Sequence, residues 1–128
     1  MKMWKLVLGC LTFVLSFALA WPMQAHAYDK SCVSLLVGAG YAAEMRTEIN
    51  ISGNVLYTEW SGSFPIGKTE CQDISFVPEG STFVAQVHAI LGETKPCNPT
   101  ITQAGGVGSA VWQANGTTLN VKCNMPSM

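Results

Sequence analysis

Short segments in which apolar and polar residues alternate are the feature of this sequence that most restricts its fold. In residues 82–91 every second residue is apolar, and in residues 41–49 apolar residues alternate with charged ones. Side chains of a β-strand point alternately to opposite faces, so each segment predicts a strand with one buried face. No segment shows the 3.6-residue repeat of an amphipathic helix. The chain is therefore expected to fold from β-strands.

Turn signals divide the chain into seven or eight such strands. Glycine, proline and asparagine are concentrated in residues 38–40, 52–54 and 78–80. Asn115 and Gly116 are expected to form a two-residue hairpin turn, because both residue types accept positive φ angles. Short strands with a turn about every ten residues indicate an antiparallel β-sandwich.

The first 27 residues have the pattern of an export signal. Lys2 and Lys5 precede an uncharged apolar run over residues 6–20, and Ala25 and Ala27 are the small residues that signal peptidase requires before its cleavage site. The apolar run is shorter than the ~20 residues of a membrane-spanning helix, which makes an uncleaved anchor the less favoured alternative. We expect residues 1–27 to be a signal peptide and residues 28–128 to be a single secreted or periplasmic domain.

The cysteines of residues 28–128 predict two disulfides. An even number of cysteines in a short exported chain is typical of a disulfide-bonded domain. Three pairings are open, and the strand alternation does not decide between them. We favour one bond that joins the two ends of the domain and a second bond inside it. The favoured pairs are Cys32 with Cys123 and Cys71 with Cys97.

Composition excludes several functional classes. Charged residues make up 12% of the chain, and residues 28–128 hold five basic and eight acidic residues, a net charge of −3. A nucleic-acid-binding domain carries a basic surface, so no nucleic-acid partner is expected. A disordered acidic tail is excluded by the high apolar content.

Residues that could carry out catalysis are few. His88 is the single histidine of residues 28–128, and a catalytic triad also needs a nucleophile and an orienting carboxylate. Paired cysteines leave no thiolate, and the clustered histidines and cysteines of a zinc site are missing from the sequence. We therefore expect no enzyme activity, no cofactor and no metal site. A hydrolytic enzyme that uses His88 is the least favoured alternative.

Loops at one end of the predicted sandwich offer a binding surface. If the strands alternate in direction, loops 61–69 and 92–99 and the last hairpin tip lie at the same end. Apolar residues at loop tips are typical of contact with a hydrophobic partner or a membrane. The alternative is that these residues belong to the core. The predicted ligand-binding residues are Phe64, Ile66, Thr118 and Leu119.

Three short segments carry a family resemblance. They read Gly-Ala-Gly-Tyr-Ala-Ala at residues 38–43, Trp-Ser-Gly at 60–62 and Gly-Thr-Thr-Leu at 116–119. In their order and approximate spacing, between Val33 and Val121, they resemble the C-terminal β-sandwich domain of the cholesterol-dependent (thiol-activated) cytolysins.

The resemblance implies a β-sandwich that recognises membrane sterol. In that family a Thr-Leu pair recognises the sterol, and by position this pair would be Thr118 and Leu119. The family's tryptophan-rich loop has no counterpart, because residues 92–99 contain no tryptophan. The resemblance does not extend to the pore-forming domains, so pore formation is not implied.

These observations together predict a small exported binding module without enzyme activity. It would contact a membrane lipid, a sterol or a glycan through the loops at one end of the sandwich. The alternative is a protein-interaction factor, such as an inhibitor or a toxin accessory protein, that uses the same loops against a protein target.

Overall fold

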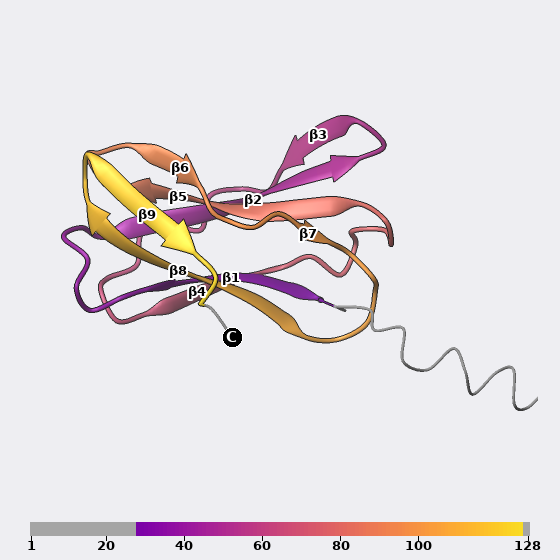
Figure 1. Ribbon diagram of the computed structural model, residues 1–128, viewed down its shortest axis with the longest axis horizontal. Coiled ribbons are helices and arrows are strands. Elements are labelled where there is room, and N and C mark those ends of the chain that lie inside the picture. Colours follow the sequence, from indigo (N-terminus) through magenta and orange to yellow (C-terminus); the bar gives the residue numbers. More distant parts are fainter. Residues whose placement is uncertain (1–27, 127–128) are drawn as a thin grey trace, which may run out of the picture.

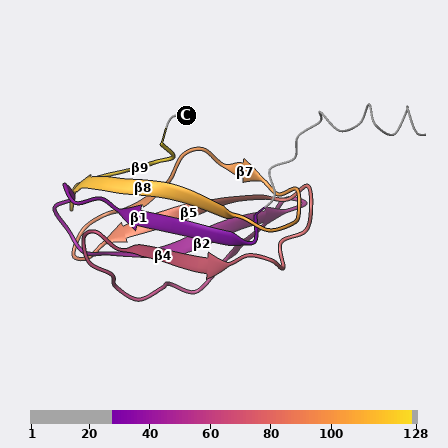
Figure 2. The same ribbon diagram turned by 90° about the horizontal axis from the view of Figure 1, so that it is seen from below.

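The computed structural model describes residues 28–126, and in this part of the chain nine strands form two stacked sheets (Figure 1). The first sheet has the order β4 (Thr69–Asp73), β1 (Lys30–Leu35), β8 (Ser109–Thr117) and β9 (Asn120–Asn124). The second has the order β3 (Asn54–Tyr57), β2 (Ala43–Ile51), β5 (Thr82–Ala89) and β6 (Thr94–Pro96), and β7 (Ile101–Thr102) also pairs with β5. Figure 2 shows β4, β1 and β8 lying over β2 and β5. The predicted all-β fold is confirmed.

Two details of the strand pairing differ from the expectation. β1 pairs with β8 in parallel, whereas a wholly antiparallel arrangement was expected. A parallel pair needs a long crossover connection, and here the connection includes the whole second sheet. β6 lies inside the predicted loop 92–99 because its backbone pairs with β5, with Thr94 opposite His88.

The two sheets enclose one hydrophobic core. Trp112 is completely buried, and its ring contacts that of Phe83 edge to face with 6.1 Å between the ring centroids. Its indole Nε1–H donates a hydrogen bond to the carbonyl oxygen of Pro99 over 3.1 Å. A buried tryptophan can therefore contribute its full apolar surface here without leaving its polar N–H unsatisfied.

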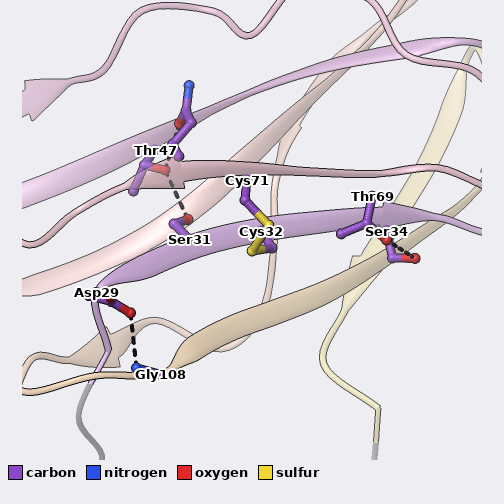
Figure 3. The surroundings of a disulfide bond; sticks show 9 residues. Asp29, Ser31, Cys32, Ser34, Thr47, Thr69, Cys71 and Gly108 are labelled. Carbon is purple, nitrogen blue, oxygen red and sulfur yellow. Dashed lines mark hydrogen bonds between the residues drawn. A yellow bond between two sulfur atoms is a disulfide. The ribbon is translucent and has the colours of Figure 1, made fainter.

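The disulfides join Cys32 to Cys71 and Cys97 to Cys123. The favoured pairing of Cys32 with Cys123 and of Cys71 with Cys97 is therefore wrong. Cys32 and Cys71 lie directly opposite each other on β1 and β4, with 4.0 Å between their Cα atoms (Figure 3). Cys32 does not reach Cys123, because β8 lies between β1 and β9.

The second disulfide connects the two sheets. Cys97 follows β6 at one edge of the second sheet, and Cys123 lies on β9 at an edge of the first. Their Cα atoms are 4.6 Å apart. The main chain adds a hydrogen bond from the Asn98 N–H to the Cys123 carbonyl oxygen over 3.1 Å. This side of the sandwich is thus closed covalently.

A buried polar contact joins the sheets beside the first disulfide (Figure 3). The Thr47 hydroxyl, on β2, lies 2.9 Å from the Ser31 hydroxyl on β1 and 2.9 Å from Gln72 Oε1 on β4. Ser31 and Thr47 are completely buried. Buried hydroxyl groups are tolerated when they are hydrogen-bonded, and here each is satisfied by a partner on the opposite sheet.

The predicted signal peptide, residues 1–27, lies outside the described residues. Within residues 28–126 no helix has the length and apolar character needed to cross a bilayer.

Candidate binding site

Four turns meet at one end of the sandwich, on the left in Figure 1. They comprise residues 36–42 between β1 and β2, residues 61–68 before β4, residues 90–93 between β5 and β6, and residues 118–119 between β8 and β9. We call these four segments together the turn end. The predicted grouping of loops 61–69 and 92–99 with the last hairpin tip holds at this end for residues 61–68, 92–93 and 118–119 (Figure 1), whereas residues 94–96 of the predicted loop form strand β6.

Main-chain hydrogen bonds hold the turns of this end against one another and against the strands. Each has a donor–acceptor distance of 2.8 to 2.9 Å. They run from the N–H of Gly40 to the carbonyl of Gly116, from Ile90 to Ala42, from Gly67 to Leu35, and from Glu93 to Thr118. The turn end is therefore a connected platform built from separate parts of the sequence.

Thr118 and Leu119 form the two-residue turn between β8 and β9. The expectation that Asn115 and Gly116 form this turn is wrong, because both lie within β8 and pair with β9. Glu93 favours the observed register, since its N–H donates to the Thr118 carbonyl and its carboxylate accepts the Val121 N–H over 2.6 Å. These contacts outweigh the local turn preference of Asn-Gly.

The two residues predicted in the loop 61–69 have different environments. Phe64 is 4% exposed and belongs to the core, and its backbone pairs with Ala43 at the start of β2. The expectation that Phe64 is presented to a ligand at the loop surface is therefore wrong, because backbone pairing draws it under the sandwich. Ile66, two residues later, is exposed.

Two further exposed apolar residues belong to the turn end. Val37 is 82% exposed and Leu91 is 96% exposed, comparable with the 80% of Leu119. Both stand directly before a glycine in a turn, and an apolar residue inside a turn signal is the pattern that would have identified them. We call Val37, Ile66, Leu91 and Leu119 the apolar tips.

Leu91 has an unusual backbone conformation. Its φ angle is +65°, a region in which a residue with a Cβ atom loses about 1–2 kcal/mol. Its side chain recovers nothing by burial, since it is almost fully exposed. Unfavourable backbone conformations of this kind concentrate at functional sites.

Gly92 brings the β5–β6 turn against the β8–β9 turn. A Cβ atom at this position would overlap the backbone carbonyl of Thr118. The close approach allows the Glu93 N–H to reach the Thr118 carbonyl. The relative position of Leu91 and Leu119 therefore depends on a glycine, which has no Cβ atom, at position 92.

Tyr41 lies beneath these turns. Its buried hydroxyl donates a hydrogen bond to the carbonyl oxygen of Asn115 over 2.7 Å. Burial, and to a lesser degree the negative charge of Glu93, raises the pKa of Tyr41 to about 12. The phenol is thus a neutral donor at physiological pH that ties the β1–β2 loop to β8.

His88 lies on the outer face of the second sheet. Its Nδ1 is 3.0 Å from the Thr94 hydroxyl, and its Nε2 is 3.9 Å from Glu44 Oε1. The carboxylate is too distant for a hydrogen bond in this geometry. In the described part of the chain, no group of three or more His, Cys, Asp or Glu side chains is arranged to hold a metal ion.

An arginine between two aromatic rings lies on the same face as His88. The guanidinium carbon of Arg46 is 4.1 Å from the ring centroid of Tyr57 and 4.5 Å from that of Trp60. Its Nε–H donates to Gln86 Oε1 over 2.8 Å. These contacts hold Tyr57 in place on β3. No sequence pattern reveals this group, because its members come from three separate segments.

Comparison with known proteins identifies no family and one solved structure of low similarity. No protein-family model matches the sequence, and no curated protein matches it. The resemblance to the cytolysin domain therefore stays a prediction. The chain is similar to a solved structure of a Gram-negative toxin, at 13% identity and a TM-score of 0.40 over 75% of this chain. It spans 22% of the length of that toxin chain.

Proposed function

We propose that this protein is a small exported binding module that places its apolar tips in the surface layer of a membrane. The exposure of Val37, Leu91 and Leu119 from three turns of one connected end carries the proposal. Two disulfides support an exported location, because such bonds persist in oxidising compartments.

The exposed side chains offer a useful amount of binding energy. Full burial of a side chain of this size contributes about 1.5–3 kcal/mol. Val37, Leu91 and Leu119 together would give about 5–9 kcal/mol before the cost of orienting the protein at the surface. This corresponds to reversible attachment rather than permanent insertion.

The charges of the turn end favour an uncharged membrane surface. Lys68 and Glu93 are the residues of charged type in its four segments, and Glu93 already accepts the Val121 N–H. Attraction to anionic lipid requires clustered basic residues, which these segments lack. The binding should therefore depend little on salt.

A sterol is the lipid that we favour. Thr118 and Leu119, consecutive in the turn between β8 and β9, carry a hydroxyl group and a branched apolar group, a pair suited to a sterol hydroxyl and ring edge. The resemblance to the cytolysin domain supports the same two residues. The alternative, a protein target with an apolar pocket, would use the same tips.

The test is flotation of the exported protein with phosphatidylcholine vesicles that contain or lack cholesterol, at low and high salt. We expect salt-insensitive flotation that is strongest with cholesterol. The double variant Leu91→Asn and Leu119→Asn should lose it. Val107→Asn, at an exposed apolar residue of the opposite end, is the matched control and should float like the wild type.

Each outcome of the flotation decides a part of the proposal. Equal flotation with and without cholesterol would retain the membrane and refute the sterol. Loss of flotation in Val107→Asn but not in the double variant would move the site to the other end. Absence of flotation with every vesicle would overturn the proposal and favour a protein target.

A further inference from the structure

The edge strands of the two sheets differ in how they are protected. An edge strand exposes backbone N–H and C=O groups that can pair with another chain, and proteins block such edges with charges, prolines or short strands. β4 carries Glu70 and Asp73, β9 carries Lys122, and β6 carries Lys95 and Pro96. β7 is two residues long. Each of these edges is therefore protected in a recognised way.

β3 is short, with four residues, but it carries neither a charge nor a proline. Residues 49–58, which include the β2–β3 turn and all of β3, contain no charged residue and no proline. Val55, Leu56 and Tyr57 are each about half exposed. β3 lies at the upper margin of the molecule in Figure 1, and no strand of residues 28–126 pairs with its outer side. The edge is thus apolar and open.

The register shows which backbone groups face outward. Ser52 and Gly53 form a two-residue turn with φ angles of +53° and +89°, which makes Ile51 and Asn54 the first hydrogen-bonded pair. Hydrogen-bonded and non-hydrogen-bonded pairs then alternate along the hairpin, as the bond from the Thr58 N–H to the Thr47 carbonyl over 3.0 Å confirms.

Val55 and Tyr57 consequently direct their main-chain groups away from β2. Both belong to non-hydrogen-bonded pairs of the hairpin, opposite Asn50 and Glu48. Their N–H and C=O groups lie symmetrically before and after Leu56 in the strand. Tyr57 is also held by the Arg46 guanidinium, so this part of the edge is already ordered.

We propose that two copies of this chain associate through β3 in antiparallel pairing about a two-fold axis at Leu56. Val55 of each copy then lies opposite the partner's Tyr57, and four main-chain hydrogen bonds form. Leu56 lies opposite the partner's Leu56. The order β3-β2-β5-β6 becomes a continuous sheet of twice as many strands.

A second copy fits this edge because the strand is complementary to itself. In a symmetric antiparallel pair of β3 strands each residue lies opposite the same residue of the partner copy or one close to it. A charge on the strand would therefore lie near the identical charge of the partner and be repelled by it. The uncharged β3 avoids this repulsion. Its Val55 and Tyr57 also form a β-branched and aromatic cross-strand pair, which is a favourable combination in sheets.

Sedimentation of the exported protein over a wide range of concentration tests the proposal. We expect a reversible monomer–dimer equilibrium. Leu56→Lys places two lysines opposite each other across the axis and should weaken the dimer at least tenfold. Leu56→Glu should act in the same way. Val107→Lys is the matched control and should dimerise like the wild type.

Mixing the two variants tests the register itself. Leu56→Lys with Leu56→Glu places opposite charges across the axis and should restore a heterodimer. Circular dichroism and thermal unfolding of each variant establish that it is folded. A wild type that stays monomeric, a dimer that survives Leu56→Lys, or a mixture that stays monomeric would each overturn the proposal. A dimer lost in Leu91→Asn with Leu119→Asn instead would place the contact at the turn end.

Discussion

Replacement of Leu91 by asparagine should raise stability and lower membrane binding at the same time. Leu91 has a φ angle of +65°, and asparagine is one of the residues that adopt this region readily. The side chain is 96% exposed, so its removal loses almost no packing. We expect the free energy of unfolding to rise by about 0.5–1 kcal/mol. For a domain of this size the melting temperature should rise by about 2–8 °C.

The same substitution removes one apolar tip from the turn end. Burial of a leucine side chain contributes about 1.5–3 kcal/mol, and 1.4 kcal/mol is a tenfold change in affinity. Vesicle binding should therefore weaken by about 10- to 100-fold. Urea unfolding and vesicle flotation of the same purified variant measure both quantities, and Val107→Asn serves as control for the loss of an exposed apolar side chain.

A lower free energy of unfolding in Leu91→Asn would refute the argument from backbone conformation. Unchanged vesicle binding would show that Leu91 does not enter the membrane. If the free energy of unfolding and the vesicle affinity both fell, the simplest explanation would be that Leu91 packs against the protein. Leu91 would then no longer count as an apolar tip.

Three other variants test the structure. Gly92→Ala should lower the free energy of unfolding by about 1–3 kcal/mol in a urea titration, because its Cβ overlaps the Thr118 backbone, and an unaffected midpoint would contradict that contact. The pKa of Tyr41 is raised to about 12 from 10.0, so the folded state retains a proton that the unfolded state loses, and stability should fall as the pH rises from 10 to 12. Tyr41→Phe should show a smaller alkaline loss in urea titrations on either side of pH 10, and an equal loss in both proteins would exclude Tyr41 as its source. Joint replacement of Cys32 and Cys71 by serine opens a loop with a sequence separation of 39 and should cost about 4 kcal/mol, measured by urea unfolding against the wild type.

Local pattern was sufficient for the fold class and for one hairpin. The alternation in residues 41–49 and 82–91 predicted β2 and β5, because a strand with one wet face imposes a period of two. The turn predicted over residues 52–54 is also present, at Ser52 and Gly53, and Gly53 is a residue type that accepts the positive φ angle needed there. These features depend on neighbours in sequence.

Features that depend on contacts between residues far apart in the sequence could not be predicted from local pattern. Alternation gives the face of each residue but not the adjacent strand. The two disulfides were therefore predicted with the wrong pairing, and the parallel pairing of β1 with β8 was missed. The true β8–β9 turn depends on Glu93, which binds the Thr118 carbonyl and the Val121 N–H. A register set by such contacts overrides the preference of a dipeptide.

The candidate site was predicted in part for the same reason. Strand direction placed Leu119 and loop 61–69 at the same end of the sandwich, as in the structure (Figure 1), but Phe64 is drawn into the core by its pairing with Ala43. Val37 and Leu91 were missed because an isolated apolar residue in a turn has no periodic pattern around it. Val37 and Leu91 lie at the same end of the sandwich only because the fold brings the four turns of the turn end together.

The two disulfides follow one another along the chain without overlap. The first closes between residues 32 and 71, and the second between 97 and 123. A polypeptide that enters an oxidising compartment from its N-terminus can therefore form the first bond before Cys97 has arrived. Nested bonds between 32 and 123 and between 71 and 97 would instead have required Cys32 to stay unpaired until Cys123, the last cysteine, had arrived. With the observed order, each bond forms between a cysteine and the next cysteine of residues 28–128 to arrive, so no thiol has to pass over an available cysteine to reach its partner.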